Sequence, residues 1–578
     1  MTHHDRPIRG IKDEEALNPK LIRREIKTWE ERAGEILKDR NWAILLFIVG
    51  PAIMLSIKSF WLFGFLWSMT VYFCHKSLTK YDALPIRLPV NAKRTDYNSP
   101  KPGGKKFNRA EGIFYIGNAR DSKQEIWLDQ NDILTHMLLF GTTGAGKTEA
   151  LLSLSYNVLA MGSGMIYVDP KGTARLAHQI LNMCRALGRE DDFLALNFGV
   201  QEKDESHKLS NTCNPFSFGT AEILTEMLSA LMPAGDAKNQ VFQAKGQTII
   251  SALMYALVDL RDKGKLVISP RVIRDHLNAD KFIELSENKN LSDFTRESLL
   301  AALSTCNFTK NMALAKQKSF HEQFGYGKAY FGQTLSSLAD TYGHIFDVEA
   351  GEIDFRDIIQ NRRVLVVLIP AIEKSPVEMS NLGKIVLSCL KAAAATGLGM
   401  RLEGSAEEVL GRLPTNFQGI GPFLTIVDEY AAITTPGFEI LLTQGRGLGM
   451  ATIVASQDYA GLVEADKKGT QQIVGNTNTK SFMKVEDPET YELIRKLTGT
   501  ANLVTMEGWN FEDQYKDNFK AAAEKMNRVD FQDLMEQTQG ETHIVWRGKL
   551  IRADMFHANP DLEMDFRTHR KIQMEPLN

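Results

Sequence analysis

The chain has 578 residues, of which 43% are hydrophobic and 24% are charged. These are ordinary globular values, so they exclude a disordered, collagen-like or low-complexity protein, and the length allows up to about four domains. The 68 Lys and Arg residues nearly balance the 71 Asp and Glu residues, and the net charge is −3. No global positive charge therefore indicates a nucleic-acid-binding protein, although this average would hide a local basic channel.

The 5 cysteines lie far apart and form neither a CxxC motif nor a Cys/His set with zinc spacing. An odd number of separated cysteines argues against a disulfide framework and favours a reduced, cytosolic compartment. We interpret all of them as small buried hydrophobic residues: Cys74, Cys184, Cys213, Cys306 and Cys389.

Two apolar runs, residues 42–57 and 60–74, are the first predicted elements. Each is somewhat shorter than the ~20 residues that cross a bilayer, and one straight helix through both would place Lys58 near the bilayer centre. A tight hairpin places Lys58 at the far surface instead. Lys and Arg residues flank the hairpin on both sides, which puts both termini in the cytoplasm. The sequence predicts a two-helix membrane anchor at 42–75; the alternative is a hydrophobic hairpin buried in a soluble core.

A phosphate-binding loop is the strongest signal in the sequence. An apolar strand at 136–140 leads directly into a glycine-rich loop, and a helical pattern follows at 151–159. Strand, loop and helix in this order are typical of a nucleotide triphosphate site. Lys147 is predicted to neutralise the β- and γ-phosphates, and the Thr148 hydroxyl to bind Mg²⁺. The predicted ATP-binding residues are Gly141, Thr142, Thr143, Gly144, Ala145, Gly146, Lys147 and Thr148.

Hydrolysis needs carboxylates in addition to the glycine-rich loop. The apolar run at 422–427 ends in Asp428 and Glu429. Asp428 is predicted to hold the Mg²⁺ shell, and Glu429 to orient or deprotonate the attacking water. Acidic pairs after strands are common, so this assignment depends on the glycine-rich loop upstream.

Further apolar runs at 165–168, 363–369 and 451–455 alternate with helical patterns. Such strands predict an α/β fold with a parallel sheet that is covered on both faces and that binds ligands at the carboxyl ends of its strands. Gln457 follows the run at 451–455 and is a candidate sensor of the γ-phosphate. A purely structural role, in which Gln457 forms a hydrogen bond within a loop, explains its position equally well.

These motifs together resemble a known family, the type IV secretion coupling proteins, and most of all its Dot/Icm branch. The resemblance rests on GTTGAGKT, DPKG at Asp169–Gly172, NPF at Asn214–Phe216, a helical insert, a strand that ends in Asp-Glu, QGRGLG at Gln444–Gly449, and SQD. It implies a RecA-like ATPase that is anchored in the bacterial inner membrane and assembles as a homohexamer.

The resemblance also implies roles for residues and partners. Arg446 would reach the nucleotide of the neighbouring subunit, and the alternative is a surface arginine in a turn. Expected partners are secretion substrates (effector proteins or relaxase–DNA), adaptor proteins and other secretion components. The loop between the membrane helices is almost absent, so contact with the channel would involve the helices or the cytoplasmic face. The long C-terminal adaptor-binding tail of some Dot/Icm members has no counterpart after the strands at 543–546 and 550–552.

Two other functions stay open. One is an FtsK-like, membrane-anchored DNA translocase, which usually has more membrane spans and a winged-helix end. The other is a nucleotide-binding docking platform with little hydrolysis, against which Glu429 argues. The expected organisation is a cytoplasmic segment at 1–41, the anchor at 42–75, a linker at 76–110, a nucleotide-binding domain at 111–219 and 348–555, an all-α domain inserted at 220–347, and a tail at 556–578.

Overall fold

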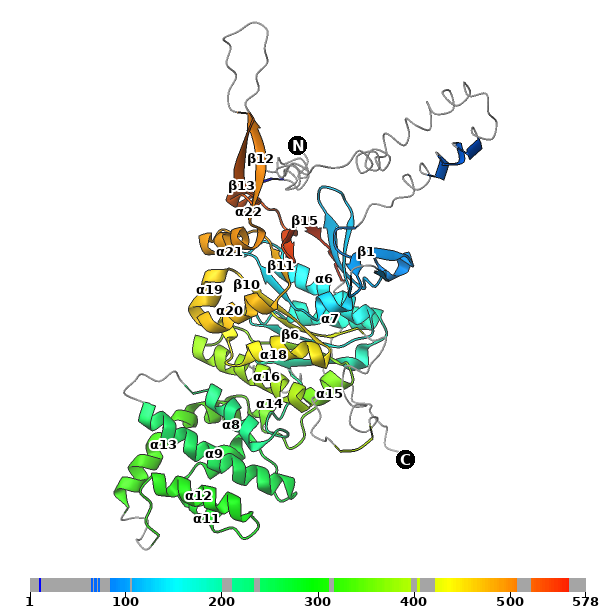
Figure 1. The fold of residues 1–578 in the computed structure, drawn as a ribbon. Coiled ribbons are helices and arrows are strands. Elements are labelled where there is room, and N and C mark those ends of the chain that lie inside the picture. Colours follow the sequence, from blue (N-terminus) through cyan, green and yellow to red (C-terminus); the bar gives the residue numbers. More distant parts are fainter. Residues whose placement is uncertain are drawn as a thin grey trace. The chain divides into compact units, whose positions relative to one another are not determined.

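The computed structural model describes residues 10–11, 64–65, 67–69, 71–72, 84–103, 106–199, 210–232, 240–310, 317–396, 403–405, 421–506 and 521–560. The chain divides into two compact units, one of residues 1–111 with 498–533 and the other of residues 112–497 with 534–578 (Figure 1). The second unit contains the sheet, the glycine-rich loop and the acidic pair.

An 11-stranded sheet is the centre of the second unit, with the order β4-β3-β15-β14-β11-β5-β10-β9-β6-β8-β7. The strands from β11 to β7 run parallel, and β14, β15, β3 and β4 extend the sheet antiparallel. The strands are β3 (Phe114–Ala119), β4 (Glu125–Leu128), β5 (Met137–Phe140), β6 (Met165–Asp169), β7 (Phe193–Asn197), β8 (Val364–Leu368), β9 (Phe423–Val427), β10 (Met450–Ser456), β11 (Thr479–Phe482), β14 (Glu541–Trp546) and β15 (Lys549–Met555).

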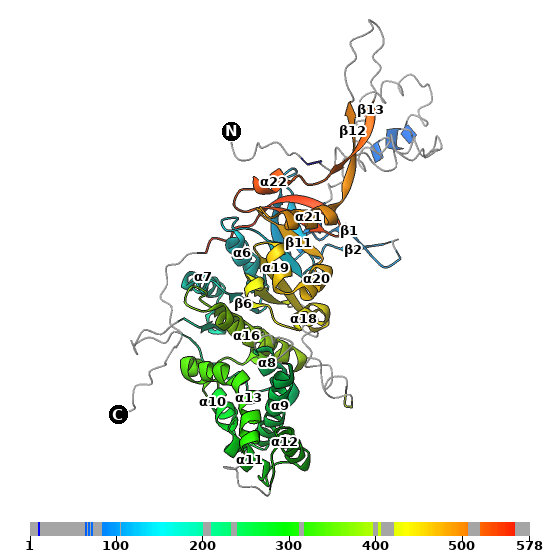
Figure 2. The ribbon, with the colours of Figure 1, turned by 90° about the vertical axis from the view of Figure 1, so that its left-hand side faces the viewer.

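Helices cover both faces of this sheet. Figure 2 shows α6 and α7 on one side of the strands and α18, α19 and α20 on the other. The prediction of an α/β fold is therefore confirmed, but the sheet is mixed and not purely parallel. The helices are α5 (Gln130–Ile133), α6 (Lys147–Ala160), α7 (Ala174–Ala186), α15 (Phe355–Gln360), α16 (Pro376–Thr396), α18 (Phe438–Gln444), α19 (Tyr459–Ala465), α20 (Lys467–Asn476), α21 (Pro488–Thr498) and α22 (Phe531–Met535).

Strand β11 lies beside β5, but its residues gave no strand signal. Thr479, Lys480 and Ser481 are polar and yet buried. Two of these side chains have hydrogen-bond partners: the Ser481 and Thr542 hydroxyls lie 2.7 Å apart, and Lys480 Nζ donates to the Thr477 carbonyl just before the strand. Sequence patterning misses such a strand because it equates burial with apolar side chains.

All regular elements in the described part of the chain between residues 221 and 346 are helical, and they lie within the range 220–347 that was assigned to an inserted domain. The central helix α9 packs against α8, α12 and α13. Gly246 on α9 meets Gly327 on α13, where a Cβ added to Gly327 would lie 2.6 Å from Ile249 Cδ1. The helices are α8 (Ala221–Ala230), α9 (Gln240–Asp262), α10 (Pro270–His276), α11 (Ala279–Ser286), α12 (Asp293–Thr305), α13 (Lys318–Ser336) and α14 (Gly343–Phe346), with a π-helical turn at Ser337–Thr341.

The first unit differs from the predicted organisation. Its β1 (Thr95–Pro100) and β2 (Phe107–Arg109) pair antiparallel inside the range 76–110 that was expected to be a linker. Its second hairpin, β12 (Thr500–Met506) and β13 (Ala521–Asn527), comes from the range that was assigned to the nucleotide-binding domain. The side chains of β1 alternate little between buried and exposed, so the sequence lacks the period-2 pattern of a strand.

No helix in the described part of the chain is long and apolar enough to cross a bilayer. Helical residues are described at 64–65, 67–69 and 71–72. The rest of the predicted anchor at 42–75 lies outside the described residues, as do most of the segments at 1–41 and 556–578.

Candidate functional site

The glycine-rich loop joins β5 to α6 at the carboxyl edge of the parallel strands. Gly144 and Gly146 have φ angles of 85° and 87°, a left-handed conformation that glycine adopts at no steric cost. The Gly141 N–H donates to the Ser456 carbonyl (3.2 Å), and the Thr142 N–H to the Lys484 carbonyl (2.9 Å). The ends of β10 and β11 thus hold the loop, and the first turn of α6 leaves its amide groups available to a phosphate.

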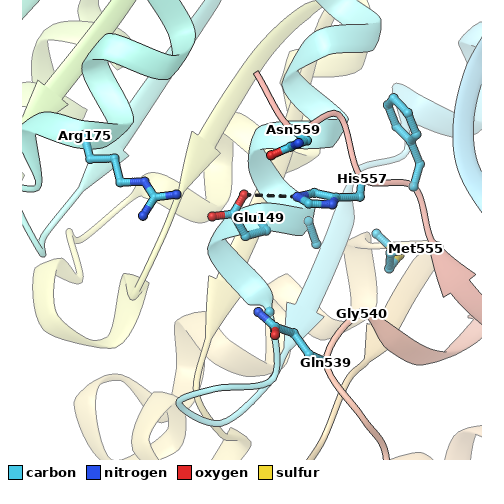
Figure 3. Close-up of a pocket in the computed structure, with 10 residues that line it drawn as sticks. Glu149, Arg175, Gln539, Gly540, Met555, His557 and Asn559 are labelled. Carbon is cyan, nitrogen blue, oxygen red and sulfur yellow. Dashed lines mark ion pairs between the residues drawn. The ribbon is translucent and has the colours of Figure 1, made fainter. Parts of the chain in front are cut away.

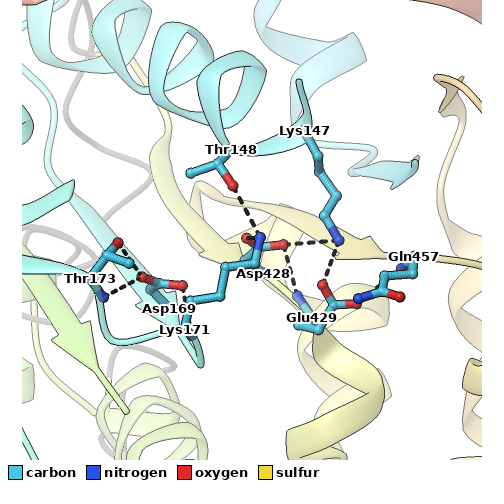
Figure 4. A network of polar contacts seen from close by, with 8 residues as sticks. All are labelled: Lys147, Thr148, Asp169, Lys171, Thr173, Asp428, Glu429 and Gln457. Carbon is cyan, nitrogen blue, oxygen red and sulfur yellow. Dashed lines mark hydrogen bonds and ion pairs between the residues drawn. The ribbon is translucent and has the colours of Figure 1, made fainter. Parts of the chain in front are cut away.

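Lys147 and the acidic pair form a buried charge cluster (Figure 4). Lys147 Nζ lies 2.6 Å from Glu429 Oε2 and 3.4 Å from Asp428 Oδ1. The Lys147 side chain is 5% exposed and that of Asp428 is 0% exposed. Since charges buried this deeply require partners, the lysine and the two carboxylates stabilise one another.

Glu429 is held in an unusual backbone conformation. Its φ of 47° is left-handed, which costs a residue with a Cβ about 1–2 kcal/mol. The Glu429 N–H donates to Asp428 Oδ1 (2.9 Å), and Glu429 Oε1 accepts from the Gln457 N–H (3.1 Å). Backbone strain of this kind is concentrated at functional sites, and here it fixes the carboxylate beside Lys147.

A second lysine reaches the same carboxylates. Lys171, in the turn after β6, places its Nζ 3.1 Å from Thr148 Oγ1 and 3.4 Å from Asp428 Oδ2. The turn is held by Asp169, whose carboxylate accepts from the Lys171 N–H (3.0 Å) and the Thr173 N–H (3.2 Å). Burial raises the pKa of Asp169, and these two hydrogen bonds oppose that rise.

A cavity of 380 Å³ lies next to the loop (Figure 3). Glu149 on α6 lies opposite Arg175 on α7 and 3.7 Å from His557 Nε2, and Gln539 and Asn559 complete the polar lining. The segment that carries His557 is hydrogen-bonded to α6, because the Ala558 N–H donates to Ser153 Oγ (2.9 Å).

Arg446 lies at the opposite edge of the sheet from this cluster. It belongs to the 3₁₀ turn Gly445–Leu448, which precedes the start of β10, whereas the glycine-rich loop follows the end of β5. The two strands are parallel, with Phe140 opposite Ser456. Arg446 is exposed and separated from the loop of its own subunit by the full length of β10.

Comparison with known proteins identifies the family. A family model described as the TraM recognition site of TraD and TraG matches residues 422–539. The type 4 coupling protein DotL of Legionella pneumophila is 38% identical over 98% of this chain and 76% of its own length. The chain belongs to the type IV coupling proteins.

Solved coupling proteins share the fold at much lower identity. The conjugative coupling protein TrwB is 16% identical, with a TM-score of 0.53 over 76% of this chain and 89% of TrwB. TrwB in complex with ADP and Mg²⁺ is 14% identical, with a TM-score of 0.53 over 82% of this chain and 92% of TrwB. The mixed α/β sheet is therefore the fold of the solved coupling proteins.

The structure brings together most of the site residues that the sequence predicted for this coupling protein. Lys147, Thr148, Asp428, Glu429 and Gln457 share one edge of the sheet, and Arg446 lies at the other. Sequence reasoning assigned no role to Lys171, although it quoted the DPKG motif, and of the cavity lining it predicted only Gly146. The polar cavity residues Glu149, Arg175 and His557 carry no motif, and only the fold places them next to the glycine-rich loop.

Proposed function

We propose that this protein hydrolyses ATP, recruits protein substrates at the bacterial inner membrane and passes them to a type IV secretion channel. The buried cluster of Lys147, Asp428 and Glu429 at the glycine-rich loop carries this proposal. A docking platform would need a nucleotide site, but it would not need a strained carboxylate at the position from which water is activated.

The residues at the loop suit Mg²⁺. Thr148 Oγ1 and Asp428 Oδ2 converge on one cation, the ammonium group of Lys171, at 3.1 and 3.4 Å. Hydroxyl and carboxylate oxygens are the ligands that Mg²⁺ prefers, so Thr148 and Asp428 would hold it. When bound, Mg²⁺ would neutralise charge on the β- and γ-phosphates.

Side chains of the protein bind the phosphates and activate the attacking water. Lys147 binds the phosphates and, in doing so, releases Glu429. The Gln457 N–H keeps the Glu429 carboxylate in place, so that Glu429 can accept a proton from the attacking water. The Gln457 side chain is exposed beside Glu429 and would contact the γ-phosphate (Figure 4).

The cavity beside Glu149 would hold the base and ribose. It lies next to the first turn of α6, just beyond the predicted phosphate-binding residues, and it is lined by both polar side chains and the apolar side chains of Met555 and Phe556. We expect His557→Ala to weaken binding of ATP with Mg²⁺ about tenfold and to leave binding of tripolyphosphate unchanged, since tripolyphosphate lacks the base and ribose. Calorimetric titration of the variant with both ligands is the test, and equal loss for both would contradict the assignment.

The family and the sequence support a proposal for the assembly and the location of the protein. Residues 42–75 would anchor the protein through two membrane helices, with both termini and the ATPase domain in the cytoplasm. A homohexamer would bring Arg446 of one subunit to the nucleotide of the next. Adaptor proteins and other secretion components are the expected partners.

Protein cargo is favoured over DNA, because three basic side chains of the helical segment are paired with carboxylates. Lys263 Nζ lies 2.9 Å from Asp259, Arg271 Nε 2.6 Å from Asp347, and Arg274 Nη1 2.6 Å from Asp340. A motor that tracks DNA needs cations available to phosphates, and its DNA binding falls steeply with salt.

The ATPase rate of the full chain in detergent tests the cargo. We expect candidate effector and adaptor proteins to stimulate hydrolysis at all salt concentrations, with little effect of DNA. Stimulation by DNA alone, lost as salt rises, would overturn this and support the FtsK-like translocase. Equal stimulation by a relaxase–DNA conjugate and by proteins would indicate that the cargo class is broader than proposed.

A further inference from the structure

We propose that Lys171 and Mg²⁺ compete for the same two oxygens, and that Lys171, once displaced by the metal, binds the terminal phosphate of ATP. The proposal rests on the nucleotide site put forward above. In this mechanism the position of the Lys171 ammonium group depends on metal binding, and the same group recognises the third phosphate.

Each oxygen of the buried Asp428 carboxylate has its own lysine (Figure 4). Oδ1 lies 3.4 Å from Lys147 Nζ, and Oδ2 lies 3.4 Å from Lys171 Nζ. Asp428 and Glu429 supply two negative charges, and Lys147 and Lys171 supply two positive ones, so the charges of these four side chains balance. Because Asp428 is 0% exposed, losing either lysine would leave this buried carboxylate with a single cationic partner.

The backbone of Lys171 is fixed. The Gly172 N–H donates to the Asp169 carbonyl (3.2 Å), and the Ala371 N–H to the Pro170 carbonyl (3.1 Å). A Cβ added to Gly172 would lie 2.5 Å from Pro370 Cα, so the turn is packed tightly against the end of β8. Any movement of the charge must therefore come from rotation of the side chain.

The side chain of Lys171 is free to make that movement. It is 45% exposed, whereas that of Lys147 is only 5% exposed. Lysine carries its charge on a flexible stem of four carbons, which lets the ammonium group exchange one oxygen for another without a change in the backbone.

Mg²⁺ cannot share these oxygens with an ammonium group. The metal binds oxygen at about 2.0–2.1 Å, so an ammonium group hydrogen-bonded to the same oxygens would lie close enough to be strongly repelled. The Asp169 carboxylate near Lys171 already accepts from the Lys171 and Thr173 N–H groups, so the phosphate oxygens that enter with the metal would offer a displaced Lys171 a new anionic partner. ATP offers a terminal phosphate that ADP lacks, so the new contact would discriminate between the two nucleotides.

The test replaces Lys171 by Met, which keeps the stem and removes the charge. Mn²⁺ serves as a spectroscopic probe of the metal site, and its binding to the full chain without nucleotide is followed by electron paramagnetic resonance. We expect Lys171→Met to bind Mn²⁺ about tenfold more tightly than the natural protein, because the competing cation is gone. Lys171→Arg keeps the charge and should exclude Mn²⁺ as the natural protein does.

Nucleotide titrations give the second readout. The natural protein should prefer ATP to ADP in the presence of Mg²⁺, and Lys171→Met should lose most of that preference while its affinity for ADP stays unchanged. Lys374→Met is the matched control, since Lys374 follows the neighbouring strand β8 and its Nζ lies 5.0 Å from the centre of the Tyr342 ring. Lys171→Gln provides a second neutral variant in case the Met variant does not fold.

The outcomes separate this inference from the proposed function. Tighter Mn²⁺ binding with a lost preference for ATP supports it. Unchanged or weaker Mn²⁺ binding in both neutral variants would show that Lys171 only pairs with Asp428, and would overturn it even if the natural protein binds ATP. If the natural protein binds no nucleotide with Mg²⁺, the proposed function itself fails.

Discussion

Lys147→Ala and Glu429→Gln are both expected to abolish ATP hydrolysis, but only the first should weaken ATP binding. Lys147→Ala removes a phosphate contact and also leaves Asp428 Oδ1 and Glu429 Oε2 without the ammonium group that lies 3.4 and 2.6 Å away. The carboxylates then repel the triphosphate. Charged hydrogen bonds contribute about 1.5–3 kcal/mol each, so the affinity for ATP should fall roughly tenfold to a hundredfold.

Glu429→Gln should keep the nucleotide. The glutamine side chain has nearly the same shape, and its carbonyl oxygen can still accept from the Gln457 N–H. It cannot accept a proton from water, which lowers the hydrolysis rate by about 10²–10⁴-fold. The variant should therefore retain ATP and lock the assembly.

Titration with a fluorescent ATP analogue and a steady-state ATPase assay, carried out on both variants, check this pair of results. Glu439→Gln on α18 is a suitable control, because it makes the same chemical change on a helix outside the cluster. An equal loss of ATP affinity in Lys147→Ala and Glu429→Gln would mean that Glu429 binds nucleotide and does not activate water.

Arg446→Ala should lower hydrolysis on the order of 10³-fold, the effect of losing an arginine finger in well-studied NTPases. Arg446 is exposed before β10, whereas the glycine-rich loop lies after β5 at the other edge of the sheet. Contact with the nucleotide of its own subunit is therefore ruled out by position. The flanking glycines leave the guanidinium free to extend toward a neighbouring subunit.

Mixing variants tests the action across subunits. Arg446→Ala protein has an intact Lys147, and Lys147→Ala protein has an intact Arg446, so one complete site forms at a mixed interface. Some activity should return in mixed oligomers, and Arg446→Lys should remain weak because lysine lacks the bidentate guanidinium group. No recovery in oligomers verified to contain both variants would contradict the role across subunits.

Much of the nucleotide site was predictable because its chemistry depends on neighbouring residues in the chain. Lys147 and Thr148 are adjacent, as are Asp428 and Glu429, and each pair follows a run of apolar residues. The runs became β5 and β9, which are buried throughout. The local sequence is sufficient to predict a site where a short motif follows a strand that must be apolar on both faces.

The sequence by itself determined the family, the α/β class and the position of the glycine-rich loop between a strand and a helix. Only the tertiary structure decided that Lys171 contacts Thr148 and Asp428, that His557 lies beside Glu149, and that Arg446 is at the far edge of the sheet. The physical reason is the order of the strands. β6, which leads into the turn that carries Lys171, lies next to β9 and not next to β5, although β5 precedes it in the chain. Side chains from distant segments meet at the carboxyl ends of neighbouring strands, and no local pattern records which strands are neighbours.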